Sequence, residues 1–209
     1  MNTVDTDIKE AIKTGKRYEV VYADPPWYYN NARKSGFHPS KHYDGELKYE
    51  QLSVLPIQQI SQPNAILFLW STNSHLDEAI YLIRDWGFKY KTNLIWDKKK
   101  RNHWGGKWHL AQHEVLLIAE NKKHNGTPLP KPSSPRRTED LRIPSIYSER
   151  SKKHSAKPQF IRNWIDKLWS TGSRIELFAI DSSVGWDTIG NQKGHKKYIL
   201  DVFLREVET

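Results

Sequence analysis

Short apolar runs, rich in β-branched and aromatic residues, recur along the chain between longer polar segments. Runs of this length and composition predict buried β-strands. Five runs are predicted as strands, with a further pair toward the C-terminal end of the sequence. The five cover residues 18–23, 65–70, 92–96, 114–119 and 175–180, and the further pair lies near 186–189 and 198–203.

Apolar residues at helical spacing predict two helices between these strands. Ser74 and Asp77 resemble a capping box at the start of the first helix, and Gly87 supplies its end. The second helix begins at Pro158 and ends before Gly172. The inward-facing positions are predicted as Leu76, Ile80 and Ile83 in the first helix and Ile161, Trp164, Ile165 and Leu168 in the second. Alternating strands and helices predict an α/β fold, with a mostly parallel sheet and helices on both faces.

Three long polar intervals interrupt this alternation, at residues 28–49, 97–111 and 121–150. Long loops without secondary structure in a compact domain are usually functional or disordered. We find no internal repeat and no clear linker, and 209 residues fit one domain with a substantial core. The chain is therefore predicted to form a single domain over residues 1–209.

The chain carries an excess of positive charge. Lys and Arg total 33 against 24 Asp and Glu, a formal net charge of +9 that suits a polyanionic partner such as nucleic acid. A merely solvated basic surface is the alternative, because charge alone carries no specificity. Cys is absent and the nine His lack metal-ligand spacing, so we expect neither disulfides nor a metal site. Because no signal peptide or membrane-length apolar stretch is found, we expect a cytoplasmic protein with no membrane association.

The tetrad Asp24-Pro25-Pro26-Trp27 directly follows the first predicted strand. Neither proline can donate to a β-ladder, so the strand ends there and leaves an acid and backbone carbonyls at its carboxyl end, where open α/β sheets bind ligands. Asp24 and the Pro25 carbonyl could accept hydrogen bonds from an exocyclic amine, which would free its lone pair to attack an electrophilic methyl group. Trp27, with Tyr28 and Tyr29 beside it, offers flat surfaces on which an extruded base could stack. A rigid turn with a packed Trp is the alternative.

This tetrad belongs to a longer series of motifs that resembles the MT-A70 family of adenine-N6 methyltransferases. The motifs are Ala-Asp-Pro-Pro-Trp at 23–27, Leu-Ser-Val-Leu-Pro-Ile at 52–57, Leu-Phe-Leu-Trp at 67–70, Trp-Gly-Phe at 86–88, Ile-Trp-Asp-Lys at 95–98, Ser-Ala-Lys-Pro at 155–158, Ile-Glu-Leu-Phe at 175–178 and Gly-Asn-Gln at 190–192. The resemblance covers nearly the whole chain. It implies a Rossmann-like methyltransferase fold, with S-adenosylmethionine as cofactor and the catalytic motif preceding the C-terminal cofactor segments. The catalytic residues that it implies are Asp24, Pro25, Pro26 and Trp27.

The same resemblance implies where the cofactor binds. The implied residues are Asp7, Ile8, Asp24, Lys157, Ser182, Ser183, Asn191 and Gln192. Asp7 and Ile8 match contacts to the cofactor's adenine, Lys157 matches the lysine near its carboxylate, and the Asn-Gln pair matches contacts to its ribose. Ser182 and Ser183 replace a His-Asn pair of better-known members, which is a departure in the ribose-binding loop. By themselves, Asp7 could cap a helix, Lys157 could be a solvated charge, and the Gly-Asn step at 190–191 could be a turn.

Two polar segments are candidates for binding the substrate. The segment after the tetrad matches one that covers the target base in the family, and Tyr43 is the candidate to pack against that base. Residues 98–108 interleave cations, aromatic side chains and glycines, which suits phosphate neutralisation and base stacking. The expected substrate-binding residues are Tyr28, Tyr43, Lys98, Arg101, Trp104 and Trp108. An ordinary loop aromatic at Tyr43 and a solvated turn at 98–108 are the alternatives.

Together these features predict an enzyme that transfers a methyl group from S-adenosylmethionine to N6 of adenine in DNA. DNA is preferred because the chain is compact and carries no appended RNA-reading module, although a charged groove serves either polymer. An RNA adenine-N6 methyltransferase is one alternative. A catalytically silent nucleic-acid-binding partner with the same fold is another, and the sequence leaves a protein partner or a homo-oligomer open.

Overall fold

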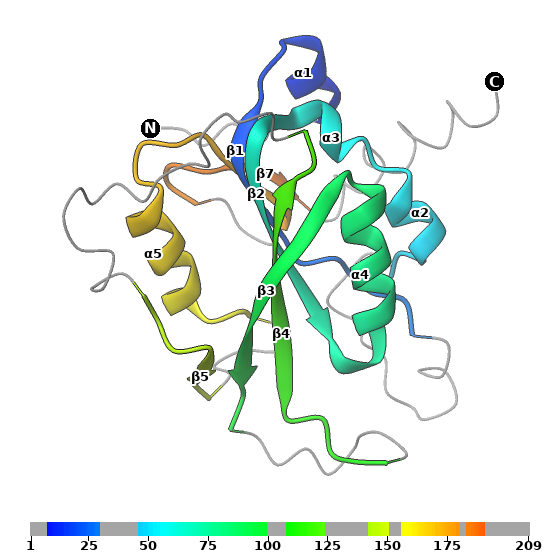
Figure 1. The fold of residues 1–209 in the computed structure, drawn as a ribbon, viewed down its shortest axis with the longest axis vertical. Helices are drawn as coiled ribbons and strands as arrows, with labels where there is room; N and C mark the ends of the chain where they lie inside the picture. Colours follow the sequence, from blue (N-terminus) through cyan, green and yellow to red (C-terminus); the bar gives the residue numbers. More distant parts are fainter. Residues whose placement is uncertain are drawn as a thin grey trace.

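Seven strands form one sheet in the computed structural model, which describes residues 8–29, 46–99, 108–123, 142–150, 156–179 and 183–190. Their order across the sheet is β5-β3-β4-β2-β1-β6-β7 (Figure 1). The strands are β1 (Tyr18–Ala23), β2 (Ser61–Thr72), β3 (Phe88–Asp97), β4 (His113–Asn121), β5 (Ile146–Ser148), β6 (Arg174–Ala179) and β7 (Asp187–Gly190). Strand β4 runs antiparallel to β2 and β3, and the other pairings within the described residues are parallel. The prediction of a mostly parallel, Rossmann-like sheet is confirmed.

Strand β1, in the interior of the sheet, is buried on both sides. Val20 and Tyr22 pack into one core cluster, whereas Val21 and Ala23 pack into a second cluster on the opposite face of the sheet. A strand covered on both faces carries a continuous apolar run rather than an alternating one, and β1 does so from Val20 onward. Strands β2 and β6 both pair with β1 in parallel, so the carboxyl end of β1 lies between two strands of the same direction.

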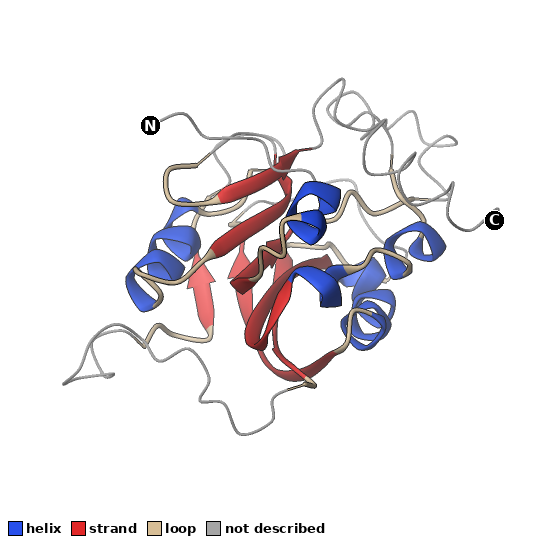
Figure 2. Ribbon diagram, turned by 90° about the horizontal axis from the view of Figure 1, so that it is seen from above, coloured by secondary structure: helices blue, strands red, loops and turns tan. Residues whose placement is uncertain are grey.

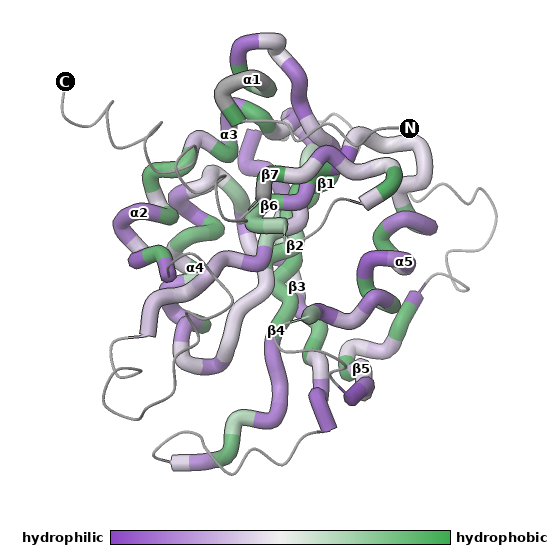
Figure 3. The backbone as a smooth tube through the Cα atoms, turned by 180° about the vertical axis from the view of Figure 1, so that it is seen from behind, coloured by the Kyte–Doolittle hydropathy of each residue, from purple (hydrophilic) through white to green (hydrophobic). Residues whose placement is uncertain are grey.

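Helices cover both faces of the sheet (Figure 2). Helices α1 (Ile8–Lys13), α2 (Tyr49–Ser53), α3 (Ile57–Ile60) and α4 (Leu76–Asp85) lie on one face, and α5 (Gln159–Leu168) lies on the other. Green stretches of the tube in Figure 3 mark apolar strands between these layers. Pro158 precedes α5, and Ile161 and Ile165 are buried in the cluster with Tyr22, as the sequence predicts. In the described ranges, no helix is long and apolar enough to cross a membrane.

The structure corrects the prediction for the start of α4. Ser74 does not cap this helix, because its hydroxyl contacts the side chains of Thr72 and His75 at a 3₁₀ turn, η2 (Asn73–His75). Leu76 is 39% exposed rather than buried. The fully buried positions of α4 are Ala79, Leu82 and Ile83, and Ile80 is partly buried against the same core.

Some short elements lie where the apolar pattern predicts none. Helices α2 and α3 and strand β5 have only five, four and three residues, which is too few to show a period. Helix α1 begins directly after Asp7, which lies outside the described residues, so the alternative in which Asp7 caps a helix stays a prediction. The predicted strand near 198–203 lies outside the described residues, and the assignment of residues 1–209 to one domain stays a prediction.

Candidate active site

Asp24 follows β1 at a point where the connections of the sheet diverge. From β1 the chain continues to β2 on one side, whereas from β6 it continues to β7 on the other side. Open α/β sheets bind ligands outside the carboxyl ends of their strands at such a switch point. The segments after β1 and β6, which carry Asp24 and Ser183, therefore stand where this fold favours a ligand site.

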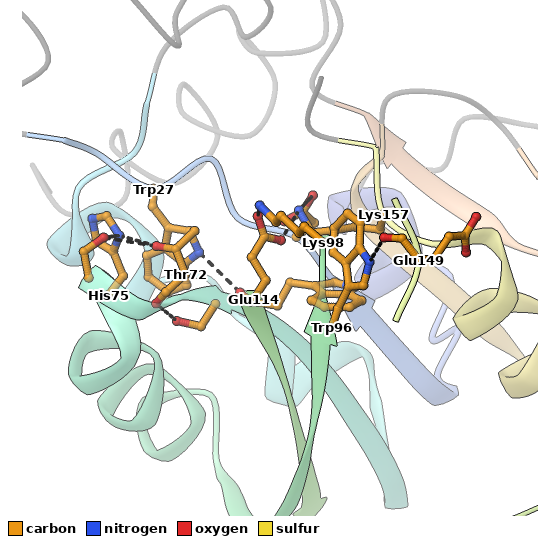
Figure 4. A network of polar contacts seen from close by, with 12 residues as sticks. Trp27, Thr72, His75, Trp96, Lys98, Glu114, Glu149 and Lys157 are labelled. Carbon is orange, nitrogen blue, oxygen red and sulfur yellow. Dashed lines mark hydrogen bonds and ion pairs between the residues drawn. The ribbon is translucent and has the colours of Figure 1, made fainter. Parts of the chain in front are cut away.

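Asp24 and three other charged side chains form an ion-pair chain, of which Figure 4 labels Lys98, Glu114 and Lys157. Lys157 Nζ lies 2.7 Å from Asp24 Oδ2 and 3.3 Å from Glu114 Oε2. Glu114 Oε1 also pairs closely with Lys98 Nζ. Asp24 and Lys157 are 133 positions apart in the sequence, so the fold alone brings the predicted catalytic acid and the predicted cofactor lysine together.

The antiparallel direction of β4 places Glu114 in this ion-pair chain. Glu114 is the second residue of β4 and pairs with Thr72 at the end of β2 and with Trp96 near the end of β3. It therefore lies at the same edge of the sheet as Asp24. The sequence analysis assigned Glu114 to a strand but not to the site, because local patterns do not reveal strand direction. Its acidic side chain at the start of an apolar run was the available signal.

The pKa values of the two carboxylates are shifted in opposite directions, because the balance between burial and ion pairing differs. Burial raises the pKa of Asp24, and the Lys157 ammonium offsets this only in part. Burial also acts to raise the pKa of Glu114, but Lys157 and Lys98 outweigh it and hold that pKa below its usual range. The side chains of Asp24, Lys157 and Glu114 are 19%, 14% and 9% exposed, so each charge depends on its partners rather than on water.

Two tryptophans form an aromatic floor beneath the lysines. Lys157 Nζ lies 5.6 Å from the centroid of the Trp70 ring, and Lys98 Nζ lies 5.3 Å from that of Trp96. The two indoles meet edge to face with centroids 6.0 Å apart, and Trp70 Nε1 donates to Tyr22 Oη at 2.6 Å. Cations over indole rings are attracted by the ring quadrupole, which helps to fix both ammonium groups.

Trp27 does not offer the exposed stacking surface that the sequence predicts. It is 5% exposed, its ring stacks on His75, and its Nε1 donates to Trp70 O at 3.3 Å. In this structure Trp27 holds the tetrad against the end of β2, as in the alternative of a rigid turn with a packed Trp. Tyr28 is partly exposed, and Lys48 Nζ lies 5.6 Å from its ring centroid.

The structure divides the predicted substrate residues. Lys98 points into the site and pairs with Glu114, which differs from the predicted role of a solvent-facing phosphate contact. Trp108 is 87% exposed, as a stacking residue requires. Tyr43, Arg101 and Trp104 lie outside the described residues, as do Asp7, Ser182, Asn191 and Gln192 of the predicted cofactor set.

Ile8 and Ser183 lie apart from the ion-pair chain. Ile8 is 2% exposed in α1, beyond the end of the sheet where β1 begins (Figure 1), so its side chain serves the core. Ser183 Oγ accepts a hydrogen bond from Arg162, whose guanidinium also pairs with Glu176. That guanidinium lies 5.7 Å from the ring centroid of Trp186. Sequence reasoning missed Arg162 and Glu176, although an acid inside the run Ile-Glu-Leu-Phe signals the need for a buried partner.

Among the residues that the structure describes, no group of three or more His, Cys, Asp or Glu side chains could hold a metal ion.

Comparison with known protein families identifies the family of this chain. The family model described as MT-A70 matches residues 18–192. The chain belongs to the MT-A70 family. This is a family of adenine-N6 methyltransferases whose methyl donor is S-adenosylmethionine, as the resemblance implies.

Individual relatives cover most of this chain. It is 32% identical over 192 residues to the type II methyltransferase M.MunI of Mycoplasma sp, with 84% of this chain and 77% of that protein covered. It is 27% identical over 199 residues to the N(6)-adenine-specific methyltransferase METTL4 of Homo sapiens, with 85% and 38% covered. It is 24% identical over 198 residues to METTL14 of Danio rerio, named the non-catalytic subunit of an N(6)-adenosine-methyltransferase, with 90% and 42% covered. The chain thus spans less than half the length of the last two.

Proposed function

We propose that this MT-A70 chain transfers a methyl group from S-adenosylmethionine to N6 of adenine in DNA. The observation that carries the proposal is the Asp24 carboxylate at the carboxyl end of β1, held 2.7 Å from Lys157. A catalytically silent chain has no need to keep a partly desolvated acid with a raised pKa at this position. The name of M.MunI as a type II methyltransferase supports DNA as the substrate.

The paired charges fit the proposed cofactor. S-adenosylmethionine supplies an electrophilic methyl group on a sulfonium centre and carries a carboxylate. The Lys157 ammonium, 14% exposed beside the switch point of the sheet, is suited to pair with that carboxylate. We assign the remaining contacts as the family resemblance implies, with Asp7 near the adenine, and leave out Ile8 because its side chain is buried in the core. The ribose contacts are assigned to Ser182, Ser183, Asn191 and Gln192.

Asp24 orients the target amine in this mechanism. Its carboxylate and the Pro25 carbonyl accept the two N–H groups, which leaves the nitrogen lone pair free to point at the methyl group. Bound S-adenosylmethionine would supply the methyl group, with the N–C bond forming as the S–C bond breaks, and Asp24 or water would accept the proton that the nitrogen loses. Because burial raises the pKa of Asp24, this carboxylate is a better proton acceptor than an exposed Asp.

Glu114 keeps Lys157 in place while Asp24 contacts the amine. It lies 3.3 Å from Lys157 and has a lowered pKa, so it stays ionised when Asp24 gains a proton. For the substrate we assign Tyr28, Tyr43 and Trp108 to base contacts. Arg101 and Trp104 are assigned to the same basic segment, whereas Lys98 belongs to the ion-pair chain.

RNA adenine methylation is the second candidate, because the relatives include proteins named for N(6)-adenosine methylation. A silent chain that supports a catalytic partner is the third, as the name of METTL14 illustrates. A homo-oligomer or a partner subunit is compatible with each. We further propose a cytoplasmic location for this activity on nucleic acid.

The experiment incubates the purified protein and S-adenosylmethionine bearing a deuterated methyl group with DNA or RNA, and measures labelled N6-methyladenine by nucleoside mass spectrometry. We expect label in DNA and a loss of at least about 100-fold in turnover for Asp24→Ala, as when one preorganised group is removed from a site. Label found only in RNA would show that the substrate is RNA and not DNA. No label in either, with intact cofactor binding in a titration, would support the silent alternative.

A further inference from the structure

His75 is a buried titratable residue that the proposed mechanism does not use. It is 5% exposed and ends η2, directly after β2, at the sheet edge where Asp24 lies. Its ring stacks on Trp27, with centroids 5.4 Å apart and an interplanar angle of 18°, and meets Tyr29 edge to face at 4.5 Å. His75 therefore contacts the last residue of the tetrad and a residue just beyond it (Figure 4).

The hydrogen bonds of His75 determine which ring nitrogen carries a proton. Nε2 lies 3.0 Å from Tyr28 O, and a carbonyl can only accept, so Nε2 donates. Nδ1 lies 2.9 Å from Thr72 Oγ1 and 3.2 Å from Ser74 Oγ. Tyr29 Oη donates to Thr72 Oγ1 at 3.1 Å, which leaves the Thr72 proton free to point at Nδ1. A ring that carries a proton on Nε2 is compatible with all these contacts.

Other bonds fix the tetrad at neighbouring points. Leu47 N donates to Pro26 O at 2.7 Å, and Trp27 Nε1 donates to Trp70 O at 3.3 Å. The bond to the Tyr28 carbonyl comes from His75, and so does the aromatic surface beneath Trp27. His75 thus joins the backbone on the far side of Trp27 to the end of β2.

We infer that His75 is a positioning residue that holds the tetrad backbone, and through it Asp24 and the Pro25 carbonyl, in the geometry that orients the target amine. The inference rests on the proposed function, since orientation matters only if an amine is methylated. A misplacement of about 1 Å at a reacting group can cost about 100-fold in rate, so a small shift of the tetrad has a large effect.

The test compares His75→Leu and His75→Gln with a matched control, Trp86→Phe. Leucine fills much of the space but makes none of these hydrogen bonds, whereas the Gln side-chain amide can still donate to the Tyr28 carbonyl. Trp86→Phe removes a different buried hydrogen bond, 2.8 Å long to Leu52 O, in the core cluster that contains Trp27. It controls for a general loss of stability.

We expect His75→Leu to lower kcat about 10- to 100-fold, with the Kd for S-adenosylmethionine changed by less than about threefold. His75→Gln should recover most of kcat, and Trp86→Phe should keep the wild-type kcat despite a similar fall in Tm. A merely structural role would lower kcat equally in the Leu variant and the control, or would show no recovery with Gln.

Hydrogen exchange of the amides at Trp27, Tyr28 and Tyr29 supplies a readout that does not depend on activity. Exchange there should be faster in His75→Leu than in the wild type, and unchanged in His75→Gln and Trp86→Phe. Unchanged exchange in His75→Leu, or an unchanged kcat in an active enzyme, overturns the inference. If the proposed function fails instead, the wild type makes no methylated adenine while the difference in exchange persists.

Discussion

Asp24 and Glu114, the two carboxylates that pair with Lys157, are predicted to affect the stability of the fold in opposite directions. The raised pKa of Asp24 means that burial makes its ionised form costly in the folded protein, even beside Lys157. The lowered pKa of Glu114 means that its two lysines more than offset its burial, so its ionised form is stabilising. At neutral pH we therefore expect Asp24→Asn to preserve or raise the free energy of unfolding and Glu114→Gln to lower it.

The structure sets the size of the loss for Glu114→Gln at about 2 kcal/mol. Removing one partner of a fully buried ion pair costs about 3–5 kcal/mol, because the other charge is left without compensation. Here the Lys98 side chain is 22% exposed and Lys157 keeps Asp24 as a partner, so water and Asp24 recover part of that cost. With a urea m-value of about 2 kcal/mol/M, the unfolding midpoint should fall by about 1 M.

Urea unfolding followed by tryptophan fluorescence, repeated at several pH values, measures both variants. Glu114 has a folded pKa below its usual 4.5, so its contribution is present above that value and is lost as the pH falls through the folded pKa. The gap between the wild type and Glu114→Gln should therefore close in acid. Asp24 has a raised pKa in the folded protein, so the wild type loses stability as the pH rises through that pKa. The free energy of unfolding of Asp24→Asn should therefore rise relative to that of the wild type toward neutral pH. Equal losses for the two variants at neutral pH would refute this reasoning.

Three further predictions concern binding. Lys157→Ala should weaken S-adenosylmethionine binding by about 1–3 kcal/mol in a calorimetric titration and leave DNA affinity unchanged. If this variant bound the cofactor as tightly as the wild type, Lys157 would not belong to the cofactor site. Neutralising residues 99–101 together should flatten the log–log salt dependence of DNA binding by about 0.7–0.9 for each lost phosphate contact. Lys98→Ala is the matched control, because Lys98 faces Glu114, and an equal change of slope in both variants would contradict that difference. Trp108→Ala should cost about 1–3 kcal/mol of DNA binding with an unchanged slope, since stacking releases no counterions, and a change of slope would count against stacking.

The sequence alone was sufficient to locate the strands and the tetrad. The run at 18–23 coincides with β1, and the runs at 65–70, 92–96 and 114–119 lie inside β2, β3 and β4. These features are local, because burial imposes a hydrophobic pattern on each short stretch by itself. Pro25 and Pro26 end a strand wherever it lies, so an acid at the carboxyl end of a buried strand could be inferred without knowing its neighbours.

Only the tertiary structure decided which residues meet Asp24. Lys157 arrives from a segment 133 positions away, and Glu114 reaches the same edge because β4 runs against its neighbours. Trp27 is buried rather than exposed because its ring stacks on His75 and its Nε1 donates to the Trp70 carbonyl. An apolar run states that a strand is buried, but not which strand pairs with it or in which direction, because pairing depends on contacts between distant segments. The ion-pair chain and the stacking of His75 on Trp27 are products of those contacts.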